Sequence, residues 1–140
     1  MKSRYEGIQN KLWNIREGCF FLSLCSVAEE YNNSKIDLID AINLVFSKNL
    51  VTSDYWIKND VKILKLLTGV QNITKRTSKT CGKLKDNEYS IAKYLNKEKT
   101  ANHFRRRYFD VYTNSKTVSE GTLVEYYIYT IGLSEKDAVL

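Results

Sequence analysis

Several residue types are scarce in this sequence of 140 residues, and each scarcity removes a class of protein. Proline is absent and glycine occurs six times, so no Pro/Gly-rich linker divides the chain. No run of about 18 apolar residues exists, which excludes a membrane-spanning helix. The N-terminal segment 1–18 has no apolar stretch suited to a signal peptide. We therefore expect a single cytoplasmic domain over residues 1–140, with a frayed polar tail at 133–140.

Cysteine and histidine are also few, and their spacing excludes most metal chemistry. An odd number of cysteines without a secretory signal speaks against a disulfide framework. The sequence has no paired CxxC or HxxxH spacing, so a zinc site is not expected. Neither a glycine-rich phosphate loop nor a carboxylate cluster is present. We expect no metal and no cofactor. The residues concerned are Cys19, Cys25, Cys81 and the single histidine, His103.

The formal net charge of +6 invites a nucleic-acid interpretation. Lys, Asn, Ile and Tyr are abundant and proline is absent, which is typical of an AT-rich genome and explains the charge without any function. The run Arg105-Arg106-Arg107, followed by Tyr108 and Phe109, could bind phosphates and stack on bases. On a strand, however, Arg106 would face away from its two neighbours. A solvated hairpin tip is the alternative interpretation of this run.

The order of the expected elements indicates an α+β domain. Helices come first and strands follow, so we expect a central N-terminal helix packed on a small antiparallel sheet formed mainly by the C-terminal part. The pattern predicts helices over 18–31, 35–49, 60–68 and 87–97, an irregular segment over 70–86, and strands over 101–112 and 122–131.

The expected helix 18–31 is apolar on nearly all sides, which predicts a buried position. One narrow polar stripe follows i, i+4, i+7, i+11 spacing and consists of Cys19, Ser23, Ser26 and Glu30. Cys19 therefore lies on this stripe at the start of the helix. There the helix dipole and the free N–H groups favour a thiolate, and the same N–H groups could hold an oxyanion.

Each residue of this candidate pair also has an ordinary structural explanation. A free cysteine commonly packs as a small buried hydrophobe, and a histidine on a strand is commonly structural. Cys19 differs from Cys25 and Cys81 by its place on the polar stripe, and His103 is the only imidazole in the chain.

The stretch GCFFLSLCSVA from Gly18, followed by helices and then by His103-Phe104 entering strands, resembles papain-like cysteine peptidases of the bacteriocin-processing type. The chain is more closely similar to uncharacterised proteins of that fold carried on Borrelia plasmids and prophages, through the stretch DVYTNSKTVSEG from Asp110. The resemblance covers about residues 5–131. It implies Cys19 as the nucleophile, His103 as the general base and acid, and Asp110 as the residue that orients the imidazole.

The chain departs from that pattern at several positions. Phe20 stands where the superfamily usually has glycine, Trp13 where it has the oxyanion-hole glutamine, and Val111 where it has proline. Three hypotheses therefore remain: a thiol-dependent peptide-bond hydrolase, a catalytically inactive interaction module on the same fold, and a basic nucleic-acid-binding accessory protein. The expected partner of the first two is a peptide or protein.

Overall fold

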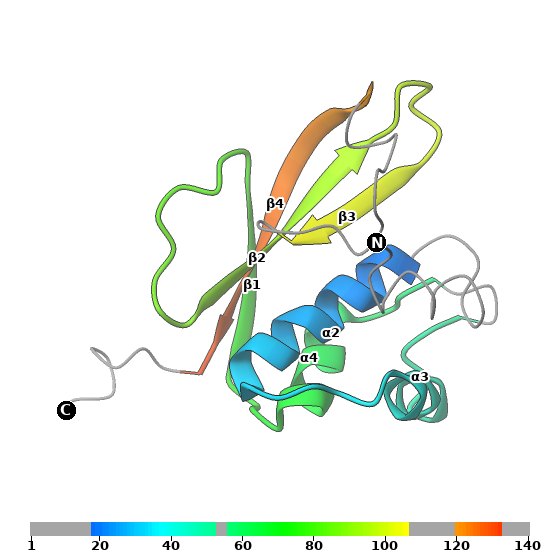
Figure 1. Ribbon diagram of the computed structural model, residues 1–140, viewed down its shortest axis with the longest axis vertical. Helices are drawn as coiled ribbons and strands as arrows, with labels where there is room; N and C mark the ends of the chain where they lie inside the picture. Colours follow the sequence, from blue (N-terminus) through cyan, green and yellow to red (C-terminus); the bar gives the residue numbers. More distant parts are fainter. Residues whose placement is uncertain (1–17, 53–55, 107–119, 133–140) are drawn as a thin grey trace.

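The computed structural model describes residues 18–52, 56–106 and 120–132, which form three helices beside a four-stranded antiparallel sheet (Figure 1). The α+β class expected from the sequence is confirmed. The strand order is β1-β4-β2-β3, so β2 and β4 are the inner strands. The elements are α2 (Gly18–Asn32), α3 (Leu38–Ser47), α4 (Asp60–Thr68), β1 (Ile73–Ser78), β2 (Glu88–Leu95), β3 (Asn102–Arg106) and β4 (Thr122–Ile131).

Helix α2 forms the centre of the core, as its apolar sequence predicts. Every residue from Gly18 to Ala28 is buried. The helix packs against α4 on one side and against β2 and β3 on the other, while α3 lies farther from the strands (Figure 1). No helix within the described ranges is long and apolar enough to cross a membrane.

The ends of α4 agree with the sequence, whereas α3 begins later than expected. The side chain of Asn59 accepts a hydrogen bond from the N–H of Lys62, and Gly69 ends α4 with a φ of 76°. Helix α3 is capped by Asp37, whose carboxylate accepts from the N–H of Asp40. The expected start at residue 35 is therefore wrong, because the aspartate side chain caps the helix at Asp37.

Two further predictions for the middle of the chain are wrong. The segment expected to be irregular contains β1, and the segment expected to be the helix 87–97 is β2. Strand β1 was missed because it lies at the sheet edge, where four successive exposed residues carry no alternating apolar pattern. In β2 the spacing of Ile91, Tyr94 and Leu95 fits a helix. Pairing on both sides, with β4 and β3, overrides that local preference.

The strands predicted at the end of the chain are confirmed within the described ranges. Strand β4 has the predicted bounds, and β3 covers the first part of the segment 101–112. The remainder of that segment and the tail at 133–140 lie outside the described residues.

A partly buried polar network joins α4 to the sheet. Tyr129 on β4 donates a hydrogen bond from its hydroxyl to Oδ2 of Asp60 at 2.7 Å. The ammonium group of Lys75 on β1 contacts the same oxygen at 2.7 Å and lies 3.9 Å from the ring centre of Tyr127. Burial, followed by the charge of Asp60, raises the pKa of Tyr129 well above its usual value.

We predict that Tyr129 makes stability depend on pH in the alkaline range. Because its pKa is raised on folding, its contribution is complete below about pH 10 and is lost as the pH rises through the folded value. Tyr129→Phe should cost roughly 1.5–3 kcal/mol at neutral pH, the value of a hydrogen bond to a charged group. The difference from wild type should shrink above pH 10. Urea unfolding measured from pH 7 to 11 tests this, with Tyr126→Phe as the control; a difference that is constant with pH contradicts it.

Candidate functional site

The polar stripe of α2 faces β3 and is used to join the helix to that strand. Ser23 donates from Oγ to the carbonyl oxygen of Phe104 at 3.4 Å. Ser26 and Glu30 accept from the guanidinium of Arg106, at 3.0 Å and 2.7 Å. The stripe that the sequence singled out is therefore real, and most of it serves a structural contact.

Cys19 continues this stripe one helical turn before Ser23 and is 3% exposed. Glu30 contacts the end of β3 at Arg106, and Ser23 contacts Phe104. The helix and the strand thus run in the same direction. Cys19 consequently lies toward the end of β3 that carries His103.

Strand alternation nevertheless directs the imidazole of His103 away from α2. The ring of Phe104 stacks on Phe20 of α2 with centroids 4.3 Å apart, and Arg106 contacts Ser26 of the same helix. Successive side chains leave a strand on opposite faces, so His103 projects from the face of β3 that α2 does not cover. The catalytic pairing of Cys19 with His103 stays a prediction, and Asp110 lies outside the described residues.

Phe20, which replaces the glycine of the resembling family, belongs to the core. Its ring is 5% exposed and meets Tyr127 of β4 edge-on, with centroids 5.6 Å apart, in addition to the stack on Phe104. The side chain of Phe20, next to Cys19, therefore packs the start of α2 against the sheet.

Arg106 is a buried charged residue whose guanidinium is held by three hydrogen bonds. Its Nε donates to the carbonyl oxygen of Ser90 at 3.0 Å, Nη1 donates to Ser26, and Nη2 donates to Glu30. The side chain of Arg106 is 8% exposed and that of Glu30 is 57% exposed. The interpretation of Arg105–Arg107 as a solvated hairpin tip is wrong at Arg106, because this residue carries the contact between α2 and the sheet.

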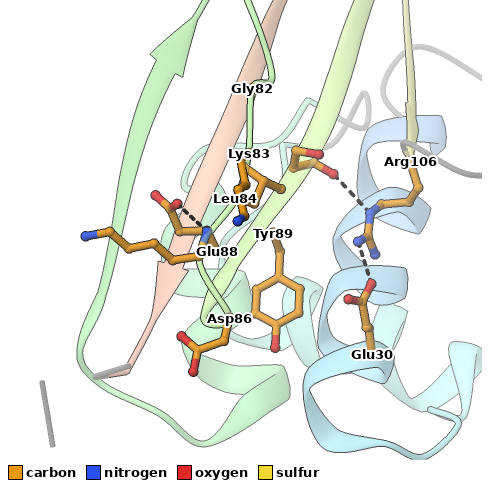
Figure 2. A pocket seen from close by; sticks show the side chains of 10 residues that line it. Glu30, Gly82, Lys83, Leu84, Asp86, Glu88, Tyr89 and Arg106 are labelled. Atoms are coloured by element: carbon orange, nitrogen blue, oxygen red, sulfur yellow. Dashed lines mark hydrogen bonds and ion pairs between the residues drawn. The ribbon is translucent and has the colours of Figure 1, made fainter. Parts of the chain in front are cut away.

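The start of β2 adjoins a pocket of about 460 Å³. Within the described residues, β3 pairs with β2 from Ile91 to Leu95, and residues 88–90 line the pocket. The loop 82–86 forms one wall of the pocket, and Glu30 of α2 with Arg106 of β3 forms the other. Figure 2 shows Tyr89 between Asp86 and Glu30, with the guanidinium of Arg106 directed toward Glu30.

Hydrogen bonds close the loop 82–86 onto the start of β2. Glu88 accepts at Oε1 from the N–H of Lys85 at 2.9 Å and at Oε2 from Arg76 at 3.1 Å. The N–H of Lys85, and after it Arg76, holds the pKa of Glu88 below its usual value, although burial opposes them. Burial and the charge of Glu30 raise the pKa of Tyr89. At neutral pH the pocket thus has a neutral phenol and an ionised, fully engaged Glu88.

A second hollow of about 380 Å³ lies along α4, between Asn59 and Gln71, and has no buried charge in its lining. The described residues contain no group of three or more His, Cys, Asp or Glu side chains that could hold a metal ion. The Arg106 pocket, which we define by the loop 82–86, Glu88, Tyr89, Ser90, Glu30 and Arg106, is therefore the candidate site.

The sequence does not predict this pocket, although it singles out two of the pocket residues, Glu30 and Arg106. Ser26 and Glu30 were placed on a polar stripe of a buried helix, and such a stripe requires a polar partner. Arg106 was already expected to face away from its arginine neighbours. Combining these two observations would have paired the stripe with Arg106, although the loop 82–86 carries no comparable signal.

No protein-family model, curated protein or solved structure matches this chain.

We predict that Arg106 stabilises the fold much more than its neighbour Arg105 does. Arg106→Met removes three hydrogen bonds at a buried position and should cost roughly 2–4 kcal/mol. Arg105→Met removes the same charge and one hydrogen bond to a carbonyl oxygen, and should cost about 1 kcal/mol or less. Urea denaturation of the two variants measures the difference. Equal losses would show that Arg106 does not hold α2 to the sheet.

Proposed function

We propose that this chain is an interaction module without thiol catalysis, and that it binds its ligand in the Arg106 pocket. The observation that carries the proposal is a nearly fully buried guanidinium in the wall of an otherwise open pocket. Burying a charge is costly, and a carbonyl, a hydroxyl and an exposed carboxylate offset this cost only in part.

The hydrogen-bonding capacity of Arg106 leaves room for a ligand. A guanidinium carries five N–H groups. Three of them are engaged, one on Nε and one on each terminal nitrogen. One N–H on Nη1 and one on Nη2 take no partner among the described residues. A ligand with a pair of acceptor oxygens can use both.

The surroundings of Cys19 favour an inactive module over a hydrolase. The thiol is buried, and Phe20 beside it is locked into an aromatic cluster. Cys19 also lies eleven residues before Glu30 on α2, about 16 Å along the helix axis from the pocket. A ligand in the Arg106 pocket would therefore not touch the thiol.

Thiol-dependent hydrolysis of a peptide bond remains the second candidate function, because α2 and β3 bring Cys19 and the backbone of His103 to the same end of their interface. For this function the imidazole would have to reach around the start of β3. The basic run offers less support for nucleic-acid binding, since the buried Arg106 interrupts it.

We predict that native Cys19 alkylates more slowly than Cys81. Cys19 is buried, whereas Cys81 is half-buried in a loop, and an inactive module has no need to activate its thiol. Iodoacetamide labelling at pH 7, followed by peptide mass spectrometry, gives the two rates. His103→Ala should leave the Cys19 rate unchanged. If Cys19 reacts faster than Cys81 and His103→Ala slows it, the hydrolase replaces the binding module as the proposal.

The binding function is tested with small aromatic probes of different charge. We expect at least one of phenylacetate, benzamide, benzyl alcohol and benzylamine, each at millimolar concentration, to shift the amide NMR signals of residues 82–90, Glu30 and Arg106. The second hollow, around Lys62 and Leu66, serves as the internal control. The proposal fails if no probe shifts the pocket signals, or if both hollows respond alike.

A further inference from the structure

Building on the proposed binding function, we infer that the Arg106 pocket recognises a carboxylate, and that Glu30 occupies the carboxylate position until a ligand replaces it. Two of the three acceptors that orient Arg106 are buried and neutral: the carbonyl oxygen of Ser90 and the hydroxyl of Ser26. They fix the guanidinium without neutralising it. The carboxylate of Glu30, at 2.7 Å, is its one anionic partner among the described residues.

Glu30 is suited to leave because most of its side chain is already in water. Its exposed fraction is 57%, against 8% for the side chain of Arg106. When Glu30 turns outward, its carboxylate regains hydration at little cost, while the buried guanidinium needs another anion. A ligand carboxylate satisfies that need and can also use the second N–H on each terminal nitrogen. The exchange preserves the ion pair and adds hydrogen bonds.

The other charges of the pocket do not oppose an anion. Glu88 already accepts from Arg76 and from the N–H of Lys85, so its charge is largely compensated. Lys83 and Lys85 line the same pocket, with Asp86 as the remaining acid. With Glu30 matched to Arg106, two lysines face two acids in the lining, and one of these acids, Glu88, is compensated by Arg76 from outside the pocket.

The walls indicate what the carboxylate is attached to. Tyr89 and Leu84 line the pocket next to its charged groups, and the ring of Tyr89 stands between the loop and α2 (Figure 2). An apolar or aromatic group can pack against them while its carboxylate meets Arg106. The chemistry fits the C-terminal residue of a peptide or a small aromatic acid, and the volume of about 460 Å³ accommodates either.

The test compares N-acetylphenylalanine with N-acetylphenylalaninamide, which differ only in whether the end group is a carboxylate. In NMR titrations of the full chain at pH 7, the acid should bind at least about tenfold more tightly than the amide. Phenylacetate is the third probe. Tighter binding of the acetylated amino acid than of phenylacetate assigns the site to a peptide C-terminus, and equal binding assigns it to a free aromatic acid.

Glu30→Gln distinguishes ligand exchange from a purely structural ion pair. It keeps the shape of the side chain but removes the competing charge, so N-acetylphenylalanine should bind about two- to fivefold more tightly. Asp86→Asn removes a charge from the same pocket without touching Arg106 and is the matched control; it should have a smaller effect. A structural role for Glu30 alone would not raise affinity.

The possible results separate this inference from the binding function. Equal binding of acid and amide overturns carboxylate recognition but leaves a binding pocket. Unchanged affinity in Glu30→Gln, or an equal gain in Asp86→Asn, overturns the exchange with Glu30. Binding of benzamide or benzylamine in the pocket without binding of either acid also overturns carboxylate recognition, whereas silence of every probe rejects the binding function itself.

Discussion

The hydrogen bonds of Arg106 tie helix and sheet together at one point. A single guanidinium on β3 connects Ser26 and Glu30 of α2 with the backbone of β2. Helix α2 is buried along most of its length, so this connection helps to hold the central helix of the core against the sheet. It also leaves the guanidinium at the boundary of a pocket, so the residue that supports the fold is the one through which we propose that a ligand binds.

The sequence predicted those parts of the fold that depend on local patterns. Helix α2 is predicted by its apolar surface, α4 has the predicted range 60–68, and β4 is predicted by its aromatic and β-branched residues. Strands β1 and β2 were not predicted, because their conformation depends on partners distant in the sequence. Ile73 of β1 pairs with Ile131, and Ile91 of β2 lies between Tyr127 and Arg106.

The candidate site could be predicted only in part, for a related reason. The polar stripe on α2 is a local pattern and was found, but its partner lies on a strand some eighty residues later. The thiol at the helix start drew attention to Cys19, since cysteine chemistry is easy to recognise from residue type. An arginine that lines a pocket has no such mark in the sequence. Its role follows from the loop 82–86, whose position depends on Glu88.

The register of β3 also limits how this protein can evolve. Phe104 and Arg106 share one face of the strand because they are two residues apart, and both are needed against α2. Point substitutions can alter either side chain, but none can turn His103 toward the helix. That would take an inserted or deleted residue, which would remove the stacked ring and the guanidinium from the interface in the same step. The contacts with α2 thus fix the register of β3, so Phe104 and Arg106 can only be kept or lost together when the length of this strand changes.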